Sequence, residues 1–144
     1  MTMYILIDID LTIANSFWRD SMIGAHPWDD YHLASKDDKP FKNVVNLINS
    51  LSAMGYSFIA VTGRTEKFRQ LTLNWFLRYH IDIHELLMRP DDIFLKNAEM
   101  KVELIKIRFG EDYKQIHFAI EDNETTCLEY QKLGITSLQI RNIR

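Results

Sequence analysis

The chain has little of what marks a disulfide-rich, secreted or membrane-spanning protein. Its single cysteine, Cys127, excludes a disulfide within the chain and favours a reducing compartment. No apolar run approaches the roughly 18 residues of a membrane span. The N-terminal apolar run is broken by Asp8 and lacks the basic residues of a signal peptide. We therefore expect a cytoplasmic protein without a membrane segment.

Excess positive charge and the glycines of a phosphate loop are missing as well. The 17 lysines and arginines face 20 aspartates and glutamates, so nucleic-acid binding would need a local basic patch. None of the five glycines has the spacing of a Walker A loop, which excludes a kinase site of that type here. What is present is a hydrophobic content of 47%, enough for the core of one domain over residues 1–144.

Short apolar runs alternate with segments of helical periodicity along most of the chain. Strands are expected over residues 3–10, 57–62, 85–88, 116–120 and 136–140. Helices are expected over residues 41–51, 66–79, 98–109 and 124–132. This order predicts an α/β fold of three layers, a Rossmann-like parallel sheet with helices on both faces. Residues 13–42 interrupt the alternation and are expected to form a small cap or lid.

Two carboxylates, Asp8 and Asp10, end the first strand. Residues two apart on a strand face the same side, so both side chains point toward one place. Ionised carboxylates are costly to bury unless they are paired or bind a metal. Such a pair suits a hard cation, a shared proton, or a nucleophile beside a proton donor. The alternative is an acidic turn at the surface.

Polar residues also follow two later strands. Thr62, Gly63 and Arg64 end one of them, and Glu121 and Asp122 follow the other. Because the carboxyl ends of parallel strands meet at one edge of a sheet, these groups are expected to converge with the first acidic pair. Converging acids indicate a magnesium site, and a hydroxyl followed by a glycine amide indicates a phosphate-binding loop. One cluster alone fits a turn, whereas three together favour a site.

Lys101 lies on or beside the apolar stripe of the helix at 98–109. A lysine that points inward needs an anion as its partner, which favours a place in the same site. A lysine at the edge of the core, with its ammonium group reaching solvent, is the alternative.

Taken in order, these residues resemble the haloacid dehalogenase superfamily of aspartate-nucleophile phosphatases. The matching motifs are Asp8-Ile9-Asp10-Leu11-Thr12, the strand-ending Thr62, the helical Lys101 and the pair Glu121-Asp122. A narrower resemblance is to the 3′-phosphatase domain of phage polynucleotide kinase-phosphatase. It lies in residues 28–32, 39–40, 61–64, 86–90 and 96–101, and in Arg19, eleven positions after Asp8. The chain departs from that pattern at Leu11, Asn97 and Glu121, where the relatives commonly have Gly, Asp and Asp.

The resemblance implies a mechanism. Asp8 would attack phosphorus and form an aspartyl-phosphate, and Asp10 would protonate the leaving oxygen and later take a proton from water. That role needs a protonated Asp10, which the nearby charge of Asp8 would favour. Mg²⁺ would be bound by Asp8, the backbone carbonyl of Asp10, and Asp122. Thr62 and Lys101 would hold the oxygens of the phosphate.

Substrate binding is assigned to other residues. Arg19, Gly63, Arg64 and Glu121 are the candidates, and the two arginines could bind a second phosphate or the backbone of an oligonucleotide. For Arg64, a salt bridge that orients Asp10 or Glu121 is the alternative.

Aromatic residues of the insert have two possible roles. Trp18, Trp28, Tyr31 and His32 could stack on a nucleic-acid base, or they could form the small core that holds the insert together. No cysteine or histidine has a suitable spacing to make His32 a metal ligand.

The insert is too short to enclose a small metabolite, so the site is expected to admit the end of a polymer. We therefore expect a Mg²⁺-dependent phosphatase acting on 3′-phosphate ends of nucleic acid. A nucleotidase or other small-molecule phosphatase is the second hypothesis, and a catalytically silent binding module of the same fold is the third. A net charge of −3 would make nucleic-acid binding weak and sensitive to salt.

Overall fold

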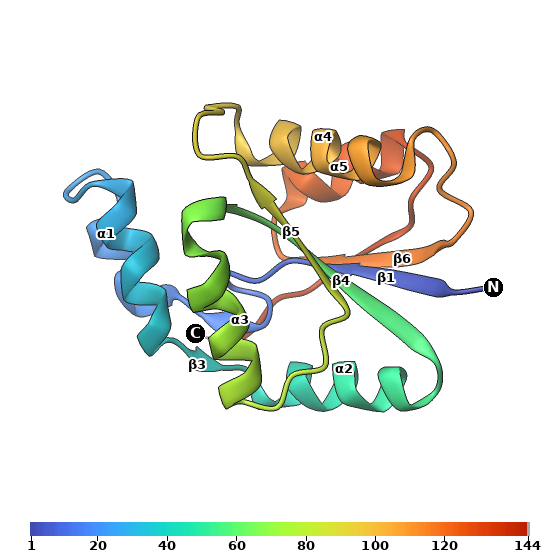
Figure 1. The fold of residues 1–144 in the computed structure, drawn as a ribbon, viewed down its shortest axis with the longest axis horizontal. Coiled ribbons are helices and arrows are strands. Elements are labelled where there is room, and N and C mark those ends of the chain that lie inside the picture. The colour runs from blue at the N-terminus through green and yellow to red at the C-terminus, as the bar shows by residue number, and fades with distance from the viewer. Residues whose placement is uncertain (144) are drawn as a thin grey trace.

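A parallel β-sheet of five strands forms the centre of the computed structural model, which describes residues 1–143 (Figure 1). The strands lie in the order β5-β4-β1-β6-β7, and every pairing between them is parallel. Their bounds are β1 Met3–Ile7, β4 Tyr56–Thr65, β5 Glu85–Arg89, β6 Ile116–Glu121 and β7 Ser137–Gln139. The N-terminal strand is therefore the middle strand of the sheet, with β4 on one side and β6 on the other.

Helices cover both faces of the sheet. One face carries α2 Lys42–Ala53 and α3 Arg69–Arg78, and the other carries α4 Asn97–Phe109 and α5 Glu124–Lys132 (Figure 1). Side chains alternate along a strand, so β1 contributes Ile5 and Ile7 to one apolar cluster and Leu6 to the other. The predicted three-layer α/β fold is confirmed.

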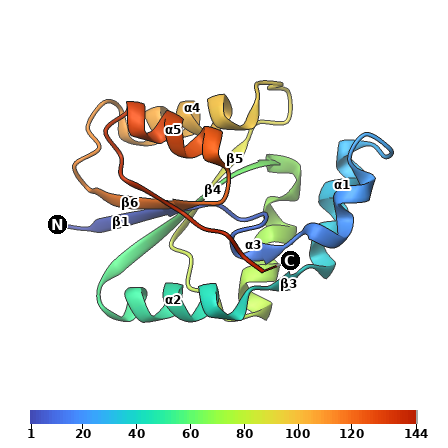
Figure 2. The same cartoon turned by 180° about the vertical axis from the view of Figure 1, so that it is seen from behind.

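The insert after β1 lies beyond the carboxyl ends of the strands (Figures 1 and 2). It consists of β2 Ala14–Asn15, the 3₁₀ helix η1 Phe17–Met22, α1 Trp28–Leu33, the 3₁₀ helix η2 Ala34–Asp37 and β3 Lys39–Pro40. The short strands β2 and β3 pair antiparallel and close the insert at its base.

Most of the expected elements are present with bounds shifted by one to three residues. The helix expected over 66–79 begins as a 3₁₀ helix, η3 Glu66–Phe68, before α3 continues it. The strand expected over 57–62 runs on to Thr65, past a register shift in its pairing with β5. Among residues 1–143 there is no helix with the length and apolarity that a bilayer crossing requires.

Candidate active site

The predicted site residues converge at the carboxyl ends of β1, β4 and β6. Ile7 of β1 pairs with Ala60 of β4 and with Ile120 of β6. The residues that follow these positions therefore emerge side by side, as expected for parallel strands. Asp8 and Asp10 thus approach the groups that follow the neighbouring strands, and the surface-turn alternative does not hold.

Lys101 of α4 binds two of the acids. Its Nζ lies 2.7 Å from Oδ1 of Asp8 and 2.6 Å from Oε1 of Glu121. Its side chain is buried with them, which excludes a lysine at the edge of the core. The hydroxyl of Thr12 donates to the other oxygen of Asp8 at 2.9 Å and lies 3.5 Å from a carboxylate oxygen of Asp122. The lysine and the threonine thus hold both oxygens of Asp8 in place.

Burial and neighbouring charges lower the pKa of one acid of this cluster and raise the pKa values of the other two. Burial opposes the charge on Asp8, but the ammonium group of Lys101 and the hydrogen bonds with Glu121 and Asp122 together outweigh it and lower the pKa of Asp8. Burial together with the charge of Asp8 raises the pKa of Glu121 well above its usual range. Burial and the hydrogen bond and charge of Asp8 raise the pKa of Asp122 to about 7. One lysine therefore does not balance three carboxylates.

This imbalance fits a divalent cation. Carboxylate oxygens of Asp8, Glu121 and Asp122 lie within 4.8 Å of one another. With Lys101 as their cationic partner, two negative charges remain for a metal ion to neutralise, and oxygen ligands are those that Mg²⁺ and Ca²⁺ prefer. Glu121 was predicted as a substrate-binding residue, whereas its side chain lies inside this cluster and is 1% exposed. Its contact with substrate stays a prediction.

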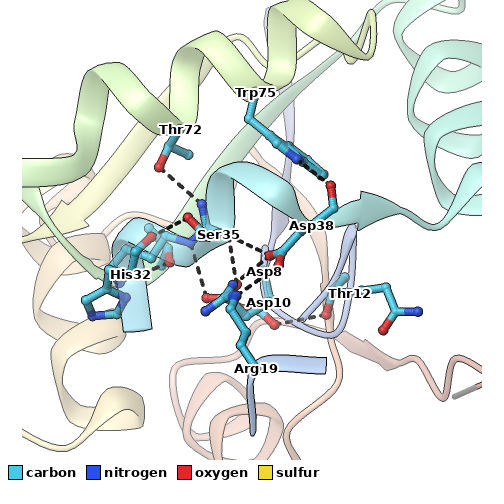
Figure 3. Close-up of polar contacts among 12 residues, drawn as sticks. Asp8, Asp10, Thr12, Arg19, His32, Ser35, Asp38, Thr72 and Trp75 are labelled. Carbon is cyan, nitrogen blue, oxygen red and sulfur yellow. Dashed lines mark hydrogen bonds and ion pairs between the residues drawn. The ribbon is translucent and has the colours of Figure 1, made fainter. Parts of the chain in front are cut away.

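Asp10 lies in a second, separate ion-pair network (Figure 3). Its Oδ1 accepts hydrogen bonds from Nη2 of Arg19 at 2.6 Å and from Nη2 of Arg64 at 2.7 Å. Arg19 also binds both carboxylate oxygens of Asp38, at 2.9 and 2.7 Å. Arg19 and Arg64 are 0% and 1% exposed. The salt bridge from Arg64 to Asp10 is the alternative role that the sequence left open for this arginine. Binding of substrate by Arg19 or Arg64 stays a prediction.

The expectation of a protonated Asp10 is wrong for the protein without substrate. Burial raises the pKa of Asp10, but the charges of Arg64 and Arg19 outweigh it and hold this pKa well below its usual range. The motif itself shows only the like charge of Asp8, two residues away. The two guanidinium groups come from η1 and β4, so their effect could not be read from the motif.

The carboxyl end of β4, at Thr62 and Gly63, is closely packed. The hydroxyl of Thr62 accepts a hydrogen bond from the backbone N–H of Arg64 at 3.1 Å. A Cβ atom at Gly63 would lie 2.4 Å from the amide oxygen of Asn97, so a side chain at this position would displace that amide. Arg89 holds that amide oxygen at 2.6 Å and the Gly63 carbonyl at 3.0 Å. A candidate phosphate-binding loop is thereby fixed against the start of α4.

The aromatic residues of the insert divide between the two roles. Tyr31 and His32 are buried, and the His32 ring contacts the rings of Trp28 and Phe68. Trp18 and Trp28 are 53% and 60% exposed. The first pair belongs to the core of the insert, and the second pair leaves indole surface available to a ligand.

Three residues of the site were missed from the sequence. Asp38 lies in a run of charged residues from Lys36 to Lys39 that reads as a solvated turn, yet it is fully buried. Gln139 and Asn142 reach the site from more than 15 and 125 positions away in the chain, at Asp122 and Leu11. No local pattern marks any of the three, since each gains its role from a long-range contact.

The sheet order, the acidic cluster and the lysine that joins Asp8 to Glu121 define a phosphatase fold of the haloacid dehalogenase superfamily. The chain belongs to the family described as "Polynucleotide kinase PNKP phosphatase domain", whose sequence model matches residues 2–143. Among curated protein sequences, none matches the chain.

Solved structures support the same fold. A chain of the Pnkp1/Rnl/Hen1 complex superimposes with a TM-score of 0.80 at 20% sequence identity over 97% of this chain. This chain spans about half of its length, 46%. A haloacid dehalogenase-like hydrolase from Streptococcus pneumoniae matches with a TM-score of 0.69 at 14% identity, covering 97% of this chain and 85% of its own. The magnesium-bound hydrolase YfnB from Bacillus subtilis matches with 0.68 at 12% identity, covering 96% and 86%.

Proposed function

We propose that this chain is a Mg²⁺-dependent phosphatase that removes the 3′-phosphate from a nucleic-acid end through an aspartyl-phosphate on Asp8. The observation that carries the proposal is the cluster in which Lys101 binds both Asp8 and Glu121 beside Asp122. Family membership supports phosphatase chemistry, and a similar fold in a chain of an RNA repair complex supports a nucleic-acid substrate.

The carboxylates of Asp8 and Asp122 and the backbone carbonyl of Asp10 would hold the Mg²⁺ ion. When bound, the ion would offset the repulsion between the carboxylates and the phosphate group. Glu121 would keep Lys101 charged and directed at Asp8, because its carboxylate binds the same ammonium group. Lys101 neutralises only part of the negative charge of Asp8, Glu121 and Asp122, and the charge that remains supports a Mg²⁺ ion at this place.

In the first step, a carboxylate oxygen of Asp8 attacks phosphorus, and the bond between phosphorus and the ester oxygen breaks. Asp10, which is ionised in the protein without substrate, would first take up a proton and then give it to that leaving oxygen. In the second step, water attacks the aspartyl-phosphate and loses a proton to Asp10, which releases inorganic phosphate and restores Asp8. The two arginines fix the direction of the Asp10 carboxylate, since both bind its Oδ1.

Thr62, the Gly63 amide and Lys101 would bind the non-bridging oxygens of the phosphate. The Thr62 hydroxyl accepts from the Arg64 amide, which leaves its own hydrogen free for donation. Phosphoryl transfer depends mainly on positioning and charge stabilisation, and these three donors supply both.

The end of a polymer fits the small insert. Elements of only two to six residues make up the insert, so it does not build a large domain over the site. The exposed indoles of Trp18 and Trp28 offer surfaces for base stacking, which contributes about 1–3 kcal/mol per base. We further propose that residues 1–144 form one phosphatase domain and that residues 13–42 are its lid. We propose that the protein acts in the cytoplasm.

Matched oligonucleotides with a 3′- or a 5′-phosphate, and the corresponding mononucleotides, test the substrate. We expect Mg²⁺-dependent release of phosphate from the 3′-phosphorylated oligonucleotide at the highest kcat/KM. Release confined to 5′-mononucleotides would refute the 3′-end assignment and leave a nucleotidase. No release from any of them, or from an aryl phosphate, would leave a silent module of the same fold.

The nucleophile is tested by Asp8→Asn. This variant should lose turnover completely, because an amide does not attack phosphorus, while its circular dichroism spectrum stays that of the wild type. Asp82→Asn makes the same chemical change at an exposed residue before β5 and should keep full activity. Residual turnover by Asp8→Asn above that of a blank would contradict the aspartyl-phosphate route.

A further inference from the structure

We propose that Asn142 is a positioning residue of the active site, which holds the loop between Asp8 and Thr12 through its side-chain amide. The inference rests on the proposed phosphatase function for its catalytic consequence, and on the contacts of residues 139–142 for its geometry. These residues begin with the last residue of β7, and in Figure 2 the chain runs from there to the loop that follows β1.

The amide nitrogen of Asn142 donates to two consecutive carbonyls. Its Nδ2 lies 3.0 Å from the carbonyl oxygen of Leu11 and 3.1 Å from that of Thr12. An amide NH₂ has two hydrogens, so both are used in this contact. Leu11 has a φ of 64°, a left-handed conformation that costs a non-glycine residue about 1–2 kcal/mol. The loop is thus held by Asn142 in a conformation that leucine does not prefer.

The held loop leads directly to the nucleophile. Thr12 accepts from Asn142 through its backbone carbonyl and donates through its hydroxyl to Oδ2 of Asp8. A displacement of the loop would therefore move the threonine hydroxyl and turn the Asp8 carboxylate. Since Oδ1 of Asp8 is bound by Lys101, the threonine controls the remaining freedom of that side chain.

The same segment holds the second half of the acidic cluster. Nε2 of Gln139 donates to the carbonyl of Asp122 at 3.2 Å, and the backbone N–H of Ile140 donates to the carbonyl of Glu121 at 2.9 Å. Residues 139–142 therefore connect the loops that carry the acids after β1 and after β6. The relative position of these two loops sets the distance between Asp8 and Asp122, and therefore the geometry of the proposed cation site.

At Asn142 the segment contacts the loop through hydrogen bonds. A cavity of about 280 Å³ borders this contact, lined by Leu11, Phe41, Asp122, Arg141 and Asn142 among others. Ile140, two positions before Asn142, packs against the apolar cluster that contains Ile5 and Ile7. Loss of the Asn142 amide should loosen the loop rather than be compensated by neighbouring side chains.

Asn142→Ala and Asn142→Asp test the inference, because an ionised aspartate has the shape of asparagine but no hydrogen to donate. Both variants should lower kcat for a 3′-phosphorylated oligonucleotide by about 10–100-fold, the range found when a residue behind a metal ligand is lost, with KM changed far less. Both should also weaken Mg²⁺ binding, measured by calorimetric titration without substrate, by about 10-fold or more.

Asn49→Ala is the matched control. Nδ2 of Asn49 donates to the carbonyl of His80 at 2.9 Å, and its Oδ1 accepts from the N–H of Asp82 at 3.1 Å, outside the site. This variant should lower the melting temperature but leave kcat and the Mg²⁺ Kd unchanged. If Asn142→Ala does not fold, Gln139→Ala removes the hydrogen bond to the Asp122 carbonyl and replaces it in the comparison.

The inference is overturned if Asn142→Ala behaves like Asn49→Ala, with lower stability but wild-type kcat and Mg²⁺ Kd. In that case the wild-type activity still supports the proposed function. Absence of activity in the wild type would instead refute the proposed function, and the calorimetric Kd of the variants would still decide the role of Asn142. A wild type that binds no Mg²⁺ would overturn both.

Discussion

Asp8 and Asp10 lie two positions apart in the chain but bind different partners, and these partners give the two carboxylates different chemical properties. Asp8 is bound by an ammonium group that it shares with Glu121, together with one hydroxyl. Asp10 is bound by two guanidinium groups, which stay charged at any pH that a protein tolerates. The first carboxylate therefore belongs to the acidic cluster, and the second belongs to the ion-pair network with the two arginines.

His32 gives a prediction at this scale. Burial, helped by the charges of Arg64 and Arg19 and opposed by that of Asp10, lowers the pKa of His32 to about 4, and its Nδ1 has no hydrogen-bond partner among residues 1–143. The unfolded chain binds a proton near pH 6.5 and the folded chain does not. The free energy of unfolding should thus fall as pH drops from about 6.5 to 4, by roughly 3 kcal/mol at most from this residue.

His32→Phe tests this, because phenylalanine keeps the ring contacts with Trp28 and Phe68 and does not titrate. Urea denaturation at several pH values should show a smaller loss of stability between pH 6.5 and 4 in the variant. At pH 7 the two proteins should differ by less than about 1.5 kcal/mol, as for a volume-conserving change. Parallel curves for wild type and variant would contradict the lowered pKa.

Whether a residue could be found from the sequence depended on how local its signal is. Lys101 could be singled out because a lysine on the apolar stripe of a helix favours an anion as its partner, and the structure excludes the alternative at the edge of the core. Asp38 was not, since its neighbours in the chain are charged and its burial follows from Arg19, 19 positions away. The roles of Arg19 and Arg64 were likewise left open, because the motif does not say which acid each one reaches.

At the scale of elements, the insert is joined to the sheet by buried charges. Arg19 comes from η1, Asp38 follows η2, and Arg64 lies on β4. Nη2 of Arg64 lies 3.7 Å from Asp38, and the indole of Trp75 on α3 donates to the Asp38 backbone carbonyl at 2.9 Å. The helices and strands of the core were predicted from their hydrophobic periodicity. The buried ion pairs between the insert and the sheet were not predicted, because they depend on contacts between distant side chains.

Asp38→Ala should therefore destabilise the protein by about 3–5 kcal/mol, because it leaves the buried Arg19 with too little negative charge. Replacing both partners, Arg19→Met with Asp38→Leu, should recover part of that loss without restoring activity. Urea denaturation measures both. Lys132→Ala, which removes an exposed ion pair with Glu129, serves as the control and should cost less than about 1 kcal/mol. A similarly small cost for Asp38→Ala would show that the network is not structural.

At the scale of the whole molecule, the strands β1 and β6 bring together an acidic cluster beside α4, and this cluster should cost stability without a cation. Mg²⁺ should raise the free energy of unfolding, by about 1.4 kcal/mol at a free concentration ten times its Kd. Asp122→Asn removes one of the carboxylates, so at pH 8 without Mg²⁺ it should be at least as stable as the wild type. Addition of Mg²⁺ should reverse that order.

Chemical denaturation with and without Mg²⁺, with EDTA as the metal-free reference, measures this reversal. The magnesium-dependent gain should be lost in Asp122→Asn and kept in Asp82→Asn. An equal gain in all three proteins would mean that the ion binds elsewhere.

The sheet order also fixes when the site can form during synthesis. Asp8 follows the first strand, but its neighbours Glu121 and Asp122 are translated more than 110 residues later, at the end of β6. A nascent chain thus contains Asp8 long before Lys101 and the acidic partners of Asp8 exist. Phosphatase activity should appear only once β6 has paired with β1, so activity reports completion of the sheet rather than the presence of its first motif.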